Sequence, residues 1–200
     1  MTQLAGRRRE LRLALRERRA ALSVDDRGAA SMAVMTRLVG LRGLREARIV
    51  SGYRAVRGEI DIDAAMVLLA RSDTTVTVPR VVGDHLEFLE WEPEDDGSIG
   101  SFGIHEPSSG RPIPLRRHDI VLAPLVAFDH QGHRLGQGGG FYDRALGAAG
   151  EHRPLVIGIA HGFQQIDAVP TEPWDIPLDA VVTDDNVLEF RPGALGPPSP

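Results

Sequence analysis

The N-terminal part of the chain shows the apolar spacing of an amphipathic helix. Its helically spaced leucines are Leu4, Leu11, Leu15 and Leu22. Another face of the same helix carries arginines three or four residues apart, namely Arg8, Arg12, Arg16 and Arg19. Surface helices are commonly charged and arginine favours helix, so this stripe is either a solvated face or a local basic surface for an anion. Ser23 then has the character of an N-cap, with Asp26 at the capping-box position, for a second helix that runs to about Leu38.

Beyond the second helix, short apolar runs alternate with helical patterns. We predict a buried strand at 47–53, a helix at 60–70 and a β-branched strand at 74–78. Pro79 should end the last of these strands. Further strands are expected at 86–91, 120–123, 155–160 and 180–183, and a further helix at 142–149. The alternation predicts one α/β domain over residues 1–190, with a largely parallel sheet and helices on both faces in a three-layer α/β/α arrangement.

Two segments lack these patterns. Residues 92–118 are rich in Gly, Pro and Ser, and because core-type strands flank them we expect a long loop rather than a linker. The tail at 191–200 carries prolines and glycines throughout, so we expect it to be disordered.

Composition narrows the class of protein. The 200 residues are 42% hydrophobic, enough for one core, and contain no cysteine, which excludes a disulfide scaffold and a cysteine nucleophile. The net charge of −5 argues against a general nucleic-acid binder, whereas the local N-terminal arginines suit a small anionic ligand. The chain has neither an apolar run that could span a membrane nor the apolar core of a signal peptide. We therefore expect a cytoplasmic protein with no membrane partner, and an organellar presequence is the alternative. We also expect a monomer.

The segment richest in candidate ligand-binding residues is 134–144, with the sequence Arg-Leu-Gly-Gln-Gly-Gly-Gly-Phe-Tyr-Asp-Arg. Its glycines can adopt positive φ and let a ligand approach the backbone closely. A helix that begins near Phe141 would add unpaired N–H groups and the positive end of its dipole, which favour a phosphate. The loop matches neither GxxxxGK[ST], because the chain contains no lysine, nor GxGxxG, because Phe141 stands where the last glycine should be. We predict a third kind of phosphate loop, and a flexible turn is the alternative.

Ligands of such sheets bind beyond the carboxyl ends of strands, so we expect chemistry after Tyr53, Val78, Ala123 and Thr183. Glu59 follows the first of these strands and either favours a helix dipole or accepts a hydrogen bond from an N–H of a polar heterocycle. Asp143, just after the glycines, suits a helix dipole or a Mg²⁺ ion, and Asp175 suits a proline-rich turn. His130 and His133 form an HxxH without an apparent third ligand, which indicates hairpin residues rather than a metal site.

The glycine-rich segment at 134–144 resembles the signature motif of a known family. RLGQGGGFYDR closely resembles the RLGxGxGYYD motif of 5-formyltetrahydrofolate cyclo-ligases, also called 5,10-methenyltetrahydrofolate synthetases. The resemblance continues through GEIDI after the first strand of the sheet, VPR after the second, a glutamine near Gln164 and PWDIPLDAVVTD near the end, and it covers all but the tail. It implies the family's α/β fold and an ATP- and Mg²⁺-dependent closure of 5-formyltetrahydrofolate to 5,10-methenyltetrahydrofolate, with release of ADP and phosphate.

The resemblance also implies a role for each matching residue. The ATP-binding residues would be Arg8, Arg12, Arg134, Leu135, Gly136, Gln137, Gly138, Gly139, Gly140, Phe141 and Tyr142. The folate-binding residues would be Glu59, Gln137, Gly138, Gly139, Gly140 and Phe141. Asp143 and Asp175 would hold Mg²⁺, and Arg134 and Asp143 would be catalytic, with Arg134 neutralising charge on the transferring phosphoryl group.

The chain departs from the family pattern at a few positions. Arg8 stands where the family often has lysine, Phe141 replaces the first tyrosine of YYD, and Leu125 lies where Pro-Gly is usual. None of these changes removes the phosphate cradle or the acids, so we expect an active enzyme. The alternatives are a non-catalytic folate- or nucleotide-binding regulator on the same scaffold and, more distantly, a phosphosugar isomerase, which requires no ATP.

Overall fold

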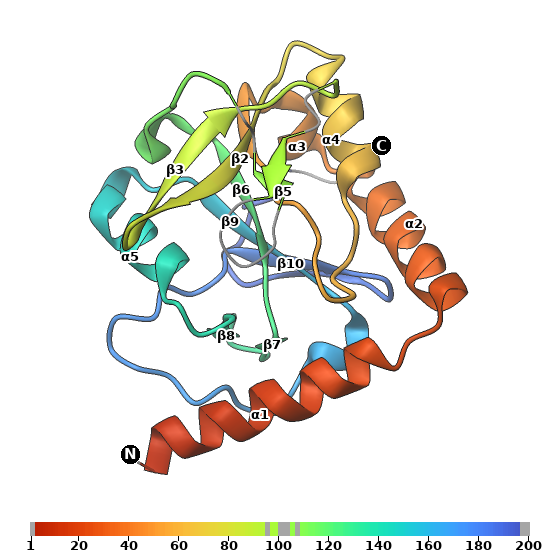
Figure 1. Ribbon diagram of the computed structural model, residues 1–200, viewed down its shortest axis with the longest axis vertical. Helices are drawn as coiled ribbons and strands as arrows, with labels where there is room; N and C mark the ends of the chain where they lie inside the picture. Colours follow the sequence, from red (N-terminus) through yellow and green to blue (C-terminus); the bar gives the residue numbers. More distant parts are fainter. Residues whose placement is uncertain (1–2, 95–96, 100–104, 107–108, 197–200) are drawn as a thin grey trace.

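A seven-stranded sheet forms the centre of the computed structural model, which describes residues 3–94, 97–99, 105–106 and 109–196 (Figure 1). The strands follow the order β11-β10-β9-β6-β1-β2-β3. Their bounds are β1 Ile49–Ser51, β2 Thr75–Val82, β3 His85–Glu90, β6 Ile120–Pro124, β9 Leu155–Ala160, β10 Ala180–Thr183 and β11 Val187–Glu189. The inner strands β10, β9, β6, β1 and β2 are parallel, and the edge strands β3 and β11 are antiparallel to their neighbours.

Helices cover both faces of this sheet, as the alternation of patterns predicts. Three helices, α2 Val24–Gly40, α3 Arg42–Glu46 and α4 Asp63–Ala70, pack on one face, and α5 Phe141–Ala149 packs on the other. Strand β6 illustrates the consequence, because Ile120 and Leu122 face one core cluster while Val121 and Ala123 face the other. A strand covered on both sides needs apolar residues at successive positions, which is why this one reads as a continuous apolar run. The predicted three-layer α/β fold is confirmed.

Helix α1, Gln3–Ala20, lies across one end of the molecule, beside the small hairpin of β7 Ala127–Phe128 and β8 Arg134–Leu135 (Figure 1). Leu11 and Leu15 of α1 pack against Ala127 and Leu135 of this hairpin. The predicted cap of the next helix is present, since the Ser23 hydroxyl oxygen accepts the backbone N–H of Asp26 at 3.0 Å. The remaining short elements are β4 Ser98–Ile99, β5 His105–Glu106, η2 Leu115–Arg117, η3 Gly150–His152 and η4 Gly162–Gln164.

The prediction that Pro79 ends its strand is wrong. Strand β2 continues through Pro79 to Val82 and pairs there with β3 alone, because its pairing with β1 extends only to the partners Ser51 and Thr77. Beyond Thr77 one edge of β2 has no strand partner among the described residues. A proline that lacks an N–H donor is tolerated at such an edge.

The expectation of disorder from residue 191 onward is also wrong for residues 191–196. Leu195 is only 7% exposed and belongs to the main core cluster, and its carbonyl accepts the backbone N–H of Gly43 at 3.1 Å. An apolar pair, Ala194 and Leu195, therefore anchors this turn against α3 despite the surrounding prolines and glycines. Residues 197–200, and 95–96, 100–104 and 107–108 of the expected loop, lie outside the described residues.

Candidate active site

The arginine stripe of α1 faces the carboxyl ends of the parallel strands rather than solvent. Arg8 donates two hydrogen bonds to Asp175, from Nη1 to Oδ2 at 2.8 Å and from Nη2 to Oδ1 at 3.2 Å. One turn further along, Nε of Arg12 donates to the carbonyl oxygen of Gly136 at 2.9 Å. Burial and the neighbouring cations Arg8 and Arg16 lower the pKa of Arg12. The stripe thus meets both the glycine loop and the proline-rich turn that precedes the last parallel strand.

The next two arginines extend these contacts. Arg16 donates from Nη2 to the side-chain Oε1 of Gln137 at 2.6 Å and to its carbonyl oxygen at 2.7 Å. Arg19 is 1% exposed, donates from Nε to the carbonyl oxygen of Arg57 at 3.0 Å, and lies 3.6 Å from Oε1 of Glu59. The family resemblance assigned ATP only to the first two arginines of the stripe, Arg8 and Arg12. The same spacing could have pointed to Arg16 and Arg19, because they continue one helical face.

Glu59 is a buried acceptor at the carboxyl end of β1. Its side chain receives the amide Nε2 of Gln137 at 2.6 Å on Oε1 and the backbone N–H of Val56 at 3.1 Å on Oε2. Burial raises its pKa, and Arg19 and these two donors oppose that rise. The helix-dipole alternative does not describe this residue, because its carboxylate contacts Gln137 of the glycine loop and Arg19 of α1 rather than the start of α4.

The glycine loop has the conformation that its sequence requires. Gly138 and Gly140 have φ of 111° and 66°, which side chains rarely adopt, and Gly140 directly precedes the first turn of α5. A Cβ on Gly139 would lie 2.6 Å from the ring of Phe141, so only glycine lets that ring pack over the loop. The carbonyls of this loop are held by Arg12 and Arg16, and the flexible-turn alternative is therefore not supported.

Arg134 and Asp143 form an ion pair behind the loop. Arg134 is 4% exposed, and its Nη1 and Nη2 each donate to Oδ1 of Asp143 at 2.8 Å. The same oxygen accepts the backbone N–H of Ile176 at 3.1 Å. Burial lowers the pKa of Arg134, and the negative charges of Asp143 and Asp175 oppose this.

A pocket of about 460 Å³ lies between α1, the glycine loop and the proline-rich turn. Arg8 and Arg12 line it from α1, three glycines line it from the loop, and Asp143 and Asp175 contribute carboxylates. The described residues contain no cluster of three or more His, Asp or Glu side chains that could hold a metal alone. Two carboxylates nevertheless suffice for Mg²⁺ when phosphate oxygens and waters complete its shell.

Two residues that the resemblance assigned to ATP have distinct surroundings. The side chain of Leu135 is fully buried in the small core beneath α1, so only its backbone could meet a ligand. The Tyr142 hydroxyl is buried without a hydrogen-bond partner among the described residues. Burial and the nearby charge of Glu59 raise the pKa of Tyr142, so it stays a neutral donor.

Two further residues, His161 and Gln164, contact backbone groups beside the site. Nε2 of His161 lies 3.0 Å from the carbonyl oxygen of Gly58, and burial lowers the pKa of this histidine. Gln164 donates from Nε2 to the carbonyls of Leu125 and Val126 at 2.8 and 2.9 Å. The resemblance marked a glutamine near this position, but no pattern in the sequence pointed to His161.

The HxxH histidines lie in the turn of the β7–β8 hairpin, as predicted. Asp129 occupies the centre of this turn and accepts the backbone N–H groups of Gln131 and His133 at 2.9 and 3.1 Å. Nδ1 of His133 lies 3.0 Å from Oδ2 of the same carboxylate. These contacts describe a structural turn.

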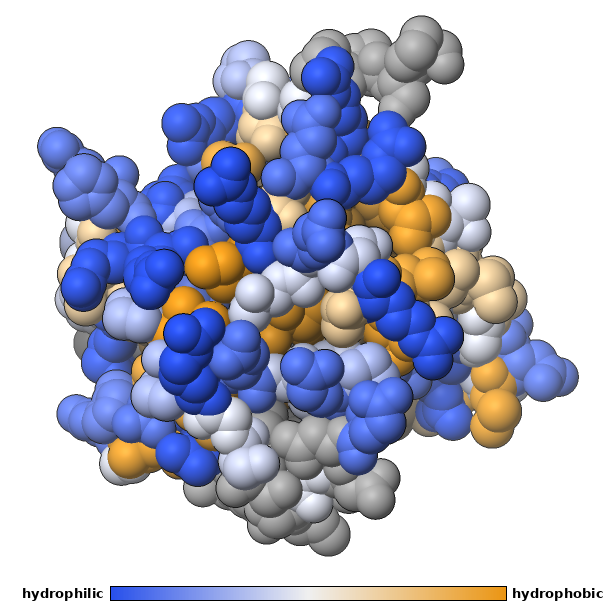
Figure 2. Space-filling view, turned by 90° about the horizontal axis from the view of Figure 1, so that it is seen from above, coloured by the Kyte–Doolittle hydropathy of each residue, from blue (hydrophilic) through white to orange (hydrophobic). Residues whose placement is uncertain are grey.

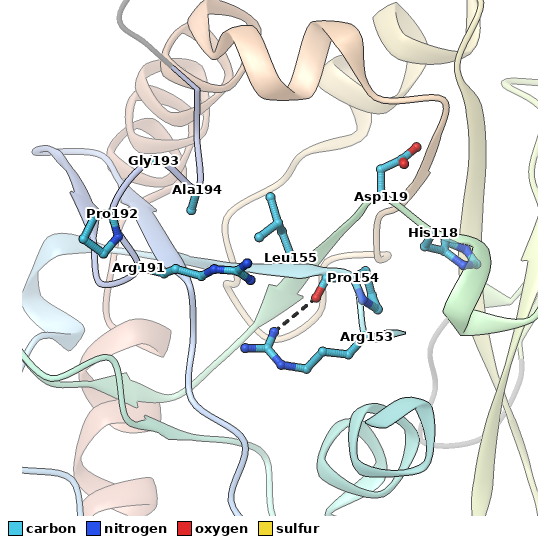
Figure 3. Close-up of a pocket in the computed structure, with 9 residues that line it drawn as sticks. All are labelled: His118, Asp119, Arg153, Pro154, Leu155, Arg191, Pro192, Gly193 and Ala194. Atoms are coloured by element: carbon cyan, nitrogen blue, oxygen red, sulfur yellow. Dashed lines mark hydrogen bonds between the residues drawn. The ribbon is translucent and has the colours of Figure 1, made fainter. Parts of the chain in front are cut away.

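A second hollow lies at the amino ends of β6 and β9 (Figure 3). Arg153 donates there to the Pro154 carbonyl at 3.1 Å and to both oxygens of Asp179 at 2.6 and 3.0 Å. Asp119 accepts the N–H groups of Arg48 and Ile49. Hydrophilic side chains dominate the face at the end of the molecule away from α1 (Figure 2). The polar groups of this hollow bind the fold itself, so the candidate site is the one under α1.

The chain is similar in sequence to known proteins of one family. A model of the 5-formyltetrahydrofolate cyclo-ligase family matches residues 5–184. The 5-formyltetrahydrofolate cyclo-ligase of Escherichia coli (strain K12) is 35% identical over 181 residues, which cover 88% of this chain and 100% of that protein. The protein of the same name from Haemophilus influenzae is 34% identical over 177 residues, covering 86% of this chain and 95% of its own length.

Solved structures give the same result. The 5,10-methenyltetrahydrofolate synthetase of Aquifex aeolicus matches with a TM-score of 0.82 and 32% identity, over 93% of this chain and 94% of that one. The synthetase of Mycoplasma pneumoniae matches with a TM-score of 0.73 and 26% identity, over 88% and 98%. No helix among the described residues is long and apolar enough to cross a membrane. The chain belongs to the 5-formyltetrahydrofolate cyclo-ligase family.

Proposed function

We propose that this protein converts 5-formyltetrahydrofolate to 5,10-methenyltetrahydrofolate with consumption of ATP and release of ADP and phosphate. One observation carries the proposal: Gln137 of the glycine loop donates to the buried carboxylate of Glu59 at 2.6 Å. A loop suited to phosphates and an acceptor suited to a heterocycle are therefore adjacent. Transfer of a phosphoryl group between two ligands requires that adjacency.

The phosphates of ATP would lie on the glycine loop. Gly138 and Gly140 give their backbone close access, and the start of α5 supplies the positive end of a helix dipole. Arg8 and Arg12 line the same pocket and add positive charge. Arginine in the place of lysine at position 8 gives a planar fork, which suits phosphate oxygens at least as well as a point charge does.

Asp143 and Asp175 fit the role of Mg²⁺ ligands. Both carboxylates line the phosphate pocket, where arginine contacts hold them in place. Bound Mg²⁺ supplies positive charge against the phosphate oxygens. The protein keeps the two acids at the pocket wall, and Arg134 adds a positive charge of its own beside Asp143.

The pterin would bind at Glu59. Its carboxylate accepts N–H donors, and the Gln137 amide already occupies this role on one oxygen. A pterin that presents N–H groups would replace or share that contact. The Tyr142 hydroxyl is buried without a partner among the described residues, and a ligand bound here could accept its hydrogen bond.

The reaction needs no covalent nucleophile from the protein. The formyl oxygen attacks the γ-phosphorus, the bond from that phosphorus to the bridging oxygen breaks, and ADP leaves. The lone pair of the formyl-bearing nitrogen forms the iminium phosphate. The neighbouring folate nitrogen then attacks the formyl carbon and loses its proton, and the carbon–oxygen bond breaks to release phosphate. Arg134 and the backbone N–H groups of the loop would offset charge on the transferring phosphoryl group.

A direct assay tests the proposal. The protein is mixed with 5-formyltetrahydrofolate, Mg²⁺ and ATP, and the near-ultraviolet absorbance of the methenyl product is followed. We expect a rise that requires both ATP and Mg²⁺. A non-catalytic regulator would bind the same ligands without any rise, and an isomerase would need no ATP.

A further inference from the structure

A tryptophan stands exposed at the rim of the phosphate pocket. Trp174 is 66% exposed, whereas the other tryptophan of the chain, Trp91, is 4% exposed. Trp174 is also the single aromatic residue among the described residues that line the pocket of Arg8 and Arg12. A large indole left in water at a charged pocket calls for an explanation, because tryptophan is usually buried for most of its surface.

The indole is held on a rigid turn. The backbone N–H of Asp175 donates to the carbonyl of Glu172 at 3.0 Å, which closes a tight turn with Pro173 and Trp174 at its two central positions. The backbone N–H of Glu172 donates back to Oδ2 of Asp175 at 2.8 Å. Arg8 fixes the same carboxylate from α1 with two hydrogen bonds. The turn therefore fixes the backbone that carries the indole, and stacking on the indole would cost little ordering of that backbone.

The rest of the pocket has the chemistry of phosphate binding. Arginines, glycines, carboxylates and one alanine line it beside Trp174, so the indole is the one aromatic ring that the described residues place at this pocket. We propose that the indole of Trp174 is the platform on which the base of the nucleotide stacks, while its phosphates lie on the glycine loop. This inference rests on the proposed use of a nucleotide and adds a residue that recognises its base.

A stacking platform has a consequence for selectivity. Every nucleobase has a π-face, so an aromatic platform binds different bases with similar strength. Discrimination by hydrogen bonds to the edge of the base would instead need fixed donors and acceptors. We therefore expect GTP to support turnover with kcat/KM within about tenfold of the value for ATP.

Fluorescence tests the contact without relying on turnover. In the Trp91→Phe variant, emission comes from Trp174 alone. We expect ATP to quench it and inorganic tripolyphosphate to compete with ATP while producing no quench of its own. An equal response to both ligands, or no response to ATP, would overturn the proposal. This readout stays decisive even if the protein fails to form the methenyl product, so the failure of the inference and that of the proposed function can be told apart.

Kinetics provide a second test. Loss of one stacked base should raise the KM for ATP about 5- to 30-fold in Trp174→Leu. We expect kcat and the KM for 5-formyltetrahydrofolate to stay within about twofold of wild type, and Trp174→Phe to recover most of the loss, because a phenyl ring still stacks. Leu68→Ala, at an exposed leucine of α4, is the matched surface control. An unchanged KM for ATP in Trp174→Leu would overturn the assignment while leaving the cyclo-ligase activity intact.

Discussion

Both terminal nitrogens of Arg134 donate to one oxygen, Oδ1, of Asp143, each across 2.8 Å. The pair keeps a buried cation beside a carboxylate, and that carboxylate lines the same pocket as Arg8 and Arg12. Phosphoryl transfer needs positive charge beside the negatively charged transferring group and a carboxylate for the metal. The proposed mechanism assigns these two tasks to the two members of this pair.

Arg134→Met should therefore depress kcat by about 100- to 1,000-fold, the usual loss when one group that stabilises developing charge is removed. The KM for 5-formyltetrahydrofolate should change little. Arg80→Met is the control, because Arg80 pairs with Glu87 on the β2–β3 hairpin, outside the candidate site. Steady-state kinetics with a melting curve for each variant check this, and a kcat within threefold of wild type would contradict the role of Arg134.

Asp175→Asn should raise the Mg²⁺ concentration required for half-maximal rate by about tenfold or more, since an amide replaces a charged ligand. At saturating Mg²⁺ the rate should recover in part. Asp167→Asn, at an exposed acid, serves as the control. If the Mg²⁺ dependence of Asp175→Asn matched that of wild type, Asp175 would only serve the turn that it closes with Glu172.

Glu59→Gln should raise the KM for 5-formyltetrahydrofolate by about 10- to 100-fold, because hydrogen bonds to a charged acceptor are the strong ones. The KM for ATP should stay close to that of wild type. Burial raises the pKa of Glu59, so its ionised form is lost at a higher pH than for an ordinary glutamate as the medium is acidified. Folate affinity of wild type should fall through that range, and the Gln variant should show a flat profile there. A wild-type profile without this fall would argue against Glu59 as the acceptor.

Local patterns predicted most of the sheet and its helices. Strands β9 and β10 have the predicted bounds because apolar residues at successive positions, covered by helices on both sides, leave a strong signal. The prediction that Pro79 ends its strand was wrong because a proline ends a strand only where its missing N–H is needed by a neighbouring strand. Which strand lies beside Pro79 is a property of the whole sheet and cannot be read from the local segment. The prediction of a disordered tail missed the turn at Leu195 for a similar reason, because the burial of Leu195 depends on its contact with α3.

The sequence predicted the individual elements of the candidate site but not the contacts between them. The glycine loop, the acids and the arginine stripe carry local signals. The contact between Gln137 and Glu59 joins residues 78 positions apart, and no spacing in the sequence encodes it. Arg19 gave only the signal of its stripe, and its burial beside Glu59 follows from the packing of α1 over the strand ends. The cytoplasmic location and the monomeric state stay predictions.

Two buried histidines predict how stability depends on pH. Burial lowers the pKa of His118 and of His161 in the folded protein. An unfolded histidine takes up a proton at about pH 6.5, so below that pH the unfolded state binds more protons and the free energy of unfolding falls. Each histidine should contribute a slope of at most about 1.4 kcal/mol per pH unit until its folded pKa is reached.

Urea unfolding at a series of pH values below neutrality checks this. We expect His118→Gln and His161→Gln each to have a shallower slope than wild type, whatever their stability at neutral pH. His152→Gln, at an exposed position, is the same substitution made at the surface for comparison. Identical slopes in all four proteins would show that these rings titrate as they do in the unfolded chain.

The central claim is that phosphoryl transfer from ATP drives the ring closure at the Arg134–Asp143 pair. Its most direct test measures phosphate release and methenyl product together, in wild type and in Asp143→Asn. We predict one phosphate for each product molecule, no phosphate release without 5-formyltetrahydrofolate, and a loss of about 100-fold or more in kcat for the variant with a much smaller change in folate affinity. Product formed without ATP, or equal losses of kcat and folate affinity in Asp143→Asn, would contradict the claim.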